Sequence, residues 1–113
     1  MPRVLITEAL FKEIGKKFST TEAQTVVDLL ENVATHPKKG KVLGSVGGVL
    51  IKEVKYMKFR FYCITDGHQL KFGSADELAA LLMKFVAMSE KKNQQRTINR
   101  IKRVLRSLGF EGF

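Results

Sequence analysis

An α+β fold is what this sequence predicts: an N-terminal helical hairpin packed on a small, mainly antiparallel sheet, with a further helix at the C-terminal end. Three observations indicate this class. Apolar residues recur at helical spacing near both ends of the chain, and β-branched and aromatic residues dominate its middle. No repeat, linker or low-complexity tract divides the 113 residues, a length typical of one domain. Residues 1–113 are therefore expected to form a single domain.

The N-terminal segment is predicted to begin with a short strand at residues 4–6 and to continue into a helix. Thr7 is a suitable N-cap, because its hydroxyl can accept a hydrogen bond from a backbone amide of the first turn. The helix is expected to end near Lys17. One stripe along it is apolar and consists of Leu10, Phe11, Ile14 and Phe18.

A second helix is predicted to follow directly, which makes the pair a helical hairpin. Thr20 or Thr21 can cap its start, and the His36-Pro37 pair ends it because proline cannot continue a helix. Its broad apolar face consists of Val26, Val27, Leu29, Leu30 and Val33.

Two loop-like segments come next. Residues 37–41, Pro-Lys-Lys-Gly-Lys, form a basic loop, and residues 42–48 are rich in glycine. A phosphate-binding P-loop is not expected here, because the Gly-Lys-Ser/Thr ending is missing and the following segment is β rather than helical.

The central segment is predicted to be β. Residues 49–56 and 59–65 have the β-branched and aromatic content of strands. The Asp66-Gly67 pair then predicts a tight hairpin turn that leads into a strand at residues 69–72.

The C-terminal part begins with a segment whose apolar pattern is irregular. Periodicity alone leaves residues 73–90 open between helix and strand, and we favour a short helical or looped insertion at 74–79 followed by a strand. A final helix follows, ending at Gly109. Its expected core stripe consists of Ile98, Ile101, Leu105 and Leu108, and another face carries Arg96, Arg100 and Arg103.

The net charge of +9 is unevenly distributed. Residues 1–37 hold four Lys/Arg and five Asp/Glu, whereas residues 38–113 hold sixteen and six. A basic segment of this kind predicts a polyanionic partner, although a merely solubilising surface is the alternative. No apolar run is long enough to span a membrane, and a lone cysteine, Cys63, fits a reducing compartment. We therefore expect a cytoplasmic protein with no membrane association, no disulfide and no bound metal.

The two central strands hold the residues that could carry chemistry. Side chains alternate between faces, so Phe59, Phe61 and Cys63 are expected to point into the core while Arg60, Tyr62 and Ile64 share the other face. Such a basic and aromatic surface suits RNA, because cations stabilise charge during phosphoryl transfer and tyrosine can stack on an unpaired base. The alternative is a charged sheet face that is simply solvated.

The two histidines are weak candidates for catalytic residues. His36 is expected to cap a helix end, and His68 is expected to be exposed after a turn. Neither completes a Ser-His-Asp or Cys-His set, so hydrolase triads are disfavoured.

The order of these segments resembles a known superfamily. A helical hairpin precedes the basic loop, the strand Leu-Ile-Lys-Glu-Val-Lys (residues 50–55) and the strand Phe-Arg-Phe-Tyr (59–62), and residues 81–92 lead into a basic helix. This arrangement resembles the RelE/ParE toxins of type II toxin–antitoxin modules. The resemblance implies a toxin that cleaves messenger RNA on the ribosome without a metal or small-molecule cofactor, and that is inhibited by a cognate antitoxin protein.

The resemblance also implies site residues. Arg60 matches the strand arginine of the family, Lys55 the basic residue of the preceding strand, Lys52 a lysine of some members, and Lys91 a lysine before the last helix. Around these catalytic candidates, the residues expected to bind RNA are Lys58, Tyr62, Tyr56, Lys92 and Arg96.

The chain also departs from the pattern. Ala87-Met88 stands where many HigB-like members have a lysine pair, and Thr97-Ile98 where RelE members carry a late tyrosine. The alternative function is therefore a non-catalytic relative, a ParE-like gyrase inhibitor or a basic RNA-binding module.

Overall fold

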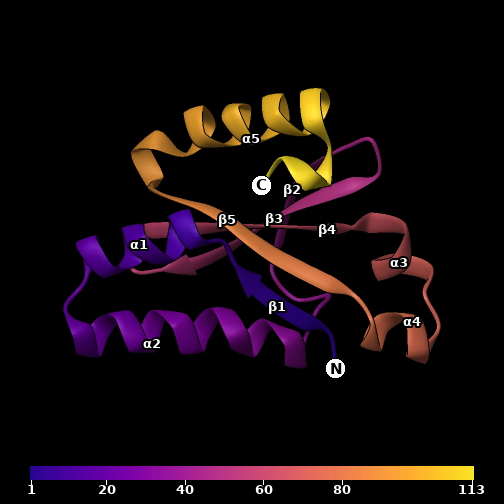
Figure 1. Ribbon diagram of the computed structural model, residues 1–113, viewed down its shortest axis with the longest axis horizontal. Helices are drawn as coiled ribbons and strands as arrows, with labels where there is room; N and C mark the ends of the chain where they lie inside the picture. The colour runs from indigo at the N-terminus through magenta and orange to yellow at the C-terminus, as the bar shows by residue number, and fades with distance from the viewer.

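A five-stranded sheet lies at the centre of the computed structural model, which describes residues 1–113 (Figure 1). The strand order is β1-β5-β4-β3-β2; β1 runs parallel to β5, and every other neighbouring pair is antiparallel. The strands are β1 (Arg3–Ile6), β2 (Lys41–Val46), β3 (Val49–Tyr56), β4 (Phe59–Asp66) and β5 (Leu82–Glu90). The α+β class predicted from the sequence is thereby confirmed.

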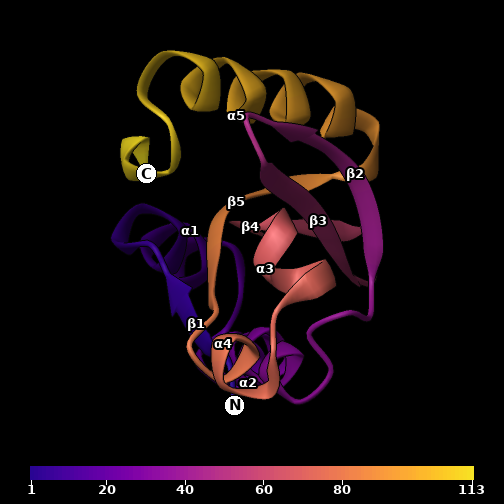
Figure 2. The same cartoon turned by 90° about the vertical axis from the view of Figure 1, so that its right-hand side faces the viewer.

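Helices cover both faces of this sheet. The helices are α1 (Glu8–Lys17), α2 (Thr20–Glu31), α3 (Gly67–Phe72), α4 (Ala75–Ala79) and α5 (Gln94–Leu108), and the three short 3-10 turns are η1 (Asn32–Thr35), η2 (Lys91–Asn93) and η3 (Phe110–Gly112). Helices α1 and α2 lie on one side of the sheet and α5 on the other (Figures 1 and 2). No helix is long and apolar enough to cross a membrane.

Each face of the sheet has its own hydrophobic core. The core under α1 and α2 includes Leu10, Ile14, Val26, Leu30, Phe61, Cys63, Met83 and Phe85. The core under α5 consists of Ile51, Tyr62, Ile64, Val86, Ala87, Ile98, Ile101 and Leu105. Strand β4 is therefore buried on both sides. The prediction that Phe61 and Cys63 point inward is confirmed, but the other face of β4 is not the open basic surface that alternation suggested.

The start of the chain follows the sequence signals closely. Thr7 caps α1, its hydroxyl accepting a hydrogen bond from the amide of Leu10 at 3.3 Å. Helix α2 is capped by Ser19 rather than by Thr20 or Thr21, because the Ser19 hydroxyl reaches the amide of Glu22 at 3.2 Å.

Two segments of the middle differ from expectation. Residues 41–46 form strand β2, although their glycine content suggested a loop; they pair with β3 across an irregularity between Val42 and Gly44. The predicted strand at 69–72 is wrong. The Asp66 carboxylate accepts a hydrogen bond from the amide of Gln69 at 2.9 Å, so Asp66 begins helix α3 instead of a hairpin turn.

The C-terminal third confirms the favoured interpretation of residues 73–90. A capping box formed by Ser74 and Glu77 begins the short helix α4, and strand β5 follows. In α5 the core stripe is Ile98, Ile101 and Leu105, whereas Leu108 is 67% exposed. Gly109 ends the helix with φ +68°, a conformation that favours glycine.

Candidate nucleic-acid interface

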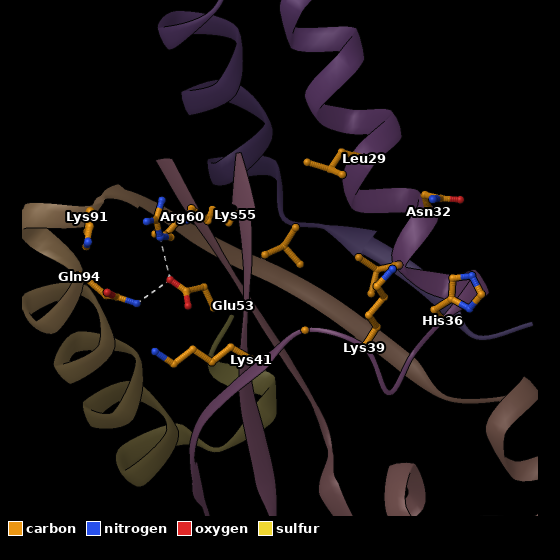
Figure 3. A pocket seen from close by; sticks show the side chains of 13 residues that line it. Leu29, Asn32, His36, Lys39, Lys41, Glu53, Lys55, Arg60, Lys91 and Gln94 are labelled. Carbon is orange, nitrogen blue, oxygen red and sulfur yellow. Dashed lines mark hydrogen bonds and ion pairs between the residues drawn. The ribbon is translucent and has the colours of Figure 1, made fainter. Parts of the chain in front are cut away.

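A cleft of about 600 Å³ opens between the C-terminal end of α2, the loop before β2 and the start of α5 (Figure 3). Strand β3 crosses it. Its basic lining residues are Lys39, Lys41, Lys55, Arg60 and Lys91, and its one acidic lining residue is Glu53. Four of the five cations are exposed lysines, so the cleft is a positively charged depression.

Lys52 holds the basic loop in place. Its side chain is only 2% exposed, and the ammonium donates hydrogen bonds to the main-chain oxygens of Pro37 and Lys39, both at 2.6 Å. Burial lowers its pKa, because desolvation disfavours the charged form. Lys52 does not line the cleft. In this conformation it positions the loop that presents Lys39 and Lys41, and the direct catalytic role suggested for it does not fit its burial.

Arg60 is fixed by an ion pair at the floor of the cleft. Its Nε lies 3.0 Å from Oε1 of Glu53, and the two side chains are 8% and 9% exposed. Nη1 of Arg60 donates to the main-chain oxygens of Met57 and Phe59 at 3.2 and 3.0 Å. Most of the guanidinium is therefore engaged within the protein, which leaves Nη2 as the nitrogen free to meet a ligand.

Glu53 connects this arginine to α5. The same Oε1 accepts a hydrogen bond from Nε2 of Gln94 at 2.7 Å, so one carboxylate joins β3, β4 and the first turn of α5 (Figure 3). A buried charge pair of this kind is stable only when its remaining polar atoms are also bonded. Neither Glu53 nor Gln94 was identified from the sequence.

Lys55 and Lys91 flank Arg60. Lys55 is paired with Arg60 in the β3–β4 register, so both side chains emerge on the same face of the sheet. The amide of Lys91 donates to the oxygen of Lys58 at 3.1 Å, which ties the approach to α5 to the β3–β4 turn. The cleft thus brings together Lys55, Arg60 and Lys91, three of the four residues predicted to be catalytic.

The two tyrosines predicted to bind RNA are engaged elsewhere. Tyr62 is fully buried under α5 and its hydroxyl lies 2.7 Å from that of Ser89, so it cannot stack on a base in this conformation. Burial raises its pKa. The Tyr56 hydroxyl donates to Glu22 at 3.1 Å, and its ring packs edge-on against Phe18. Desolvation, followed by the Glu22 carboxylate, raises the pKa of Tyr56.

The remaining predicted RNA-binding residues are exposed but lie outside the cleft. Lys58 and Lys92 both pair with Glu90, at 3.1 and 3.6 Å. The hydrogen bond from Lys58, supported by both positive charges, lowers the pKa of Glu90. Arg96 lies on the exposed side of α5 and forms no ion pair.

The structure adds His36 to the cleft. The main-chain amide of His36 ends η1, as a helix-end role predicted, but its side chain also lines the cleft beside Asn32 and opposite the Arg60 end (Figure 3). The basic run at 37–41 was the sequence signal that could have drawn attention to this residue. His68 is exposed, as predicted, and its ring lies 5.2 Å from that of Phe72.

No group of three His, Cys, Asp or Glu side chains comes together in a way that could hold a metal ion. Ala87 and Met88, at the positions where the resemblance suggested a lysine pair, are both buried in the sheet.

No protein-family model matches the chain, and no curated protein is significantly similar to it in sequence. Among solved structures, the fold is similar to that of the isolated E. coli RelE toxin, with a TM-score of 0.47 and 12% identity. The alignment covers 88% of this chain and 97% of that one. A similarity at this level assigns the chain to no family.

Proposed function

We propose that this protein is the toxin of a toxin–antitoxin module and that it acts by cleaving messenger RNA on the ribosome. The observation that carries the proposal is the cleft, where exposed lysines surround Arg60 and the single carboxylate is already paired with that arginine. A positively charged depression with no free acid suits a phosphodiester backbone. The segment order that resembles RelE/ParE toxins supports the same function.

RNA cleavage by the substrate's own 2′-hydroxyl requires few protein groups. The 2′-hydroxyl of the RNA loses its proton to a water molecule as it attacks the adjacent phosphorus, the bond to the 5′-oxygen breaks, and the negative charge on the phosphate oxygens increases in between. Lys55 and Nη2 of Arg60 would stabilise that charge, and the ammonium of Lys91 would donate a proton to the departing 5′-oxygen. The nucleophile comes from the substrate, so no cofactor is required.

A second candidate function is RNA binding that blocks translation without cleavage. It is favoured by the way Arg60 is held, because its Nε and Nη1 are already bonded to Glu53, Met57 and Phe59. It is also favoured by the lining, because an ammonium group can stabilise negative charge but has no lone pair with which to accept a proton.

The test is induced expression of the protein with growth and transcript 5′-ends followed together. Wild type is expected to arrest growth and to produce new 5′-ends inside translated codons. The Lys55→Ala/Lys91→Ala variant removes two exposed cleft cations, so it should fold normally and lose both effects. The matched control is Lys16→Ala/Lys17→Ala, which removes two exposed charges from the last turn of α1, where no residue lines the cleft.

Each outcome separates the candidates. Arrest with new ends in wild type and control, but not in the cleft variant, supports ribonuclease activity. Arrest without new ends supports the binding function. Cleavage that survives in the cleft variant contradicts the proposed site. On this proposal the protein works in the cytoplasm, and its partners are the ribosome, messenger RNA and a cognate antitoxin that covers the cleft.

A further inference from the structure

Helix α5 carries a row of positive charge that no acidic residue neutralises. Residues Gln94–Leu108 include five Lys/Arg and no Asp or Glu. The apolar stripe packs on the sheet, and four exposed residues form what we call the arginine face: Arg96, Arg100, Arg103 and Arg106. The four ion pairs of the protein all lie elsewhere. Helix α5 lies on the side of the sheet opposite α1 and α2 (Figure 1), and all four arginines are exposed.

This arrangement opposes the stability of the helix. Residues three and four apart are neighbours on a helix surface, so successive members of the arginine face repel one another. Arg96 also lies in the first turn, near the positive end of the helix dipole. Helices α1, α2 and α4 have acidic residues in that position, whereas α5 has none. An external polyanion would remove both unfavourable effects, which is the reason to look for a ligand here.

The chemistry of the surface selects the kind of polyanion. The other exposed polar residues of α5 are Gln95, Asn99 and Ser107. A protein interface normally has an apolar centre, and the one large exposed apolar side chain of α5, Leu108, lies at the far end of the helix. Interfaces with nucleic acid are polar and positive instead. Four of the five cations are arginine, whose planar fork fits phosphate better than an ammonium does.

We propose that the arginine face binds the phosphate backbone of duplex RNA. The face extends for about 15 Å along a straight helix, at 1.5 Å per residue, and a rigid row of charges suits the regular backbone of a duplex. The inference deepens the proposed function by naming what the protein contacts outside the cleft, and it rests on RNA being the target.

The position of α5 connects this surface to the cleft. Lys91, just before α5, and Gln94, its first residue, both line the cleft. Arg96 lies two residues after Gln94. Figure 3 shows Lys91 and Gln94 on the side of the cleft formed by α5. A duplex held on the arginine face therefore lies beside the cleft entrance, and an adjoining single strand can enter it.

The test measures binding of a short blunt-ended RNA duplex by fluorescence anisotropy over a range of salt concentrations, without ribosomes. The test variant is Arg96→Gln/Arg100→Gln/Arg103→Gln, and the control is Lys12→Gln/Lys16→Gln/Lys17→Gln on α1. Both lower the net charge from +9 by three, to +6. Each lost phosphate contact reduces the slope of log affinity against log salt by roughly 0.9, so the arginine variant should lose about 2 to 3 in slope.

The control variant should keep the wild-type slope, and the arginine variant should melt at the wild-type temperature or above, since it has lost only repulsive charge. Equal loss in both variants, an unchanged slope in the arginine variant, or no duplex binding by wild type overturns the inference. Arginine-dependent binding of poly-glutamate without duplex binding also overturns it, in favour of an acidic protein partner. This assay measures binding and not cleavage. If the protein binds duplex RNA but its expression produces no cut transcripts, the nuclease function is wrong and this inference stands.

Discussion

Replacing Glu53 by alanine tests the ion pair that fixes Arg60. The substitution leaves a guanidinium that is 8% exposed without its carboxylate, and it removes the acceptor of the Gln94 side chain at 2.7 Å. Breaking a buried pair from one side costs about 3 to 5 kcal/mol. Unfolding entropy near 2.1 cal/mol/K per residue amounts to roughly 0.24 kcal/mol/K for this chain, so the melting temperature should fall by about 13 to 21 °C.

Thermal and urea unfolding followed by circular dichroism measures this effect. The matched variant is Glu53→Met/Arg60→Met, which removes both charges and should be more stable than the Glu53→Ala chain because no charge is left unpaired. If Glu53→Ala melts within a few degrees of wild type, the pair does not hold Arg60. If the double variant is as destabilised as the sum of the single Met substitutions, the two side chains are not coupled.

Three further predictions concern buried residues. Lys52→Met removes the two bonds to the 37–41 loop and should cost about 1 to 3 kcal/mol, with faster proteolytic cleavage of that loop as the direct readout. Tyr62→Phe loses only the bond to Ser89, so it should cost about 1 kcal/mol in urea unfolding and leave growth arrest intact; loss of arrest in a folded variant would restore an RNA-binding role for the hydroxyl. Cys63 is 1% exposed and burial raises its pKa to about 12, so iodoacetamide should label it only at the rate of unfolding; fast labelling of the native protein would show that this core opens.

The sequence was sufficient for elements whose signals are local. The cap at Thr7, the helical stripe of α1 and the β-branched content of β3 and β4 each lie within a few residues, and all three elements are present. The short helix at 75–79 was also within reach, because Ser74 and Glu77 form a capping box.

Local signals failed where a distant segment decides the outcome. Asp66-Gly67 is a good hairpin signal, but Asp is an equally good helix cap, and the choice depends on β4 pairing with β5 rather than with the residues that follow at once. Alternation in β4 was read correctly, yet it does not reveal that α5 covers the face carrying Tyr62. A strand buried on both sides has no solvent face for the pattern to identify.

The ion pair at the floor of the cleft could not be predicted from the sequence for the same reason. Glu53 lies opposite Tyr62, and Arg60 lies opposite Lys55, so the carboxylate meets the guanidinium diagonally across two strands. That contact can be predicted only when the strand register is known. The resemblance made Lys52 a catalytic candidate, whereas its position next to Glu53 on β3 puts it on the opposite face of the sheet, where it is bonded to the basic loop.

One carboxylate therefore links the chemistry of the cleft to the position of α5. Glu53 accepts from Arg60 on β4 and from Gln94 on α5, so a displacement of the start of α5 removes a hydrogen bond from the group that orients the arginine. Lys91 lies in η2, directly before α5; its amide is bonded to the main-chain oxygen of Lys58 in the β3–β4 turn, and its side chain lines the cleft. The arginine face is carried on that helix too. We therefore expect contacts made along α5 to affect Arg60 through Glu53, and Gln94→Ala should weaken that effect while leaving every cation of the cleft in place.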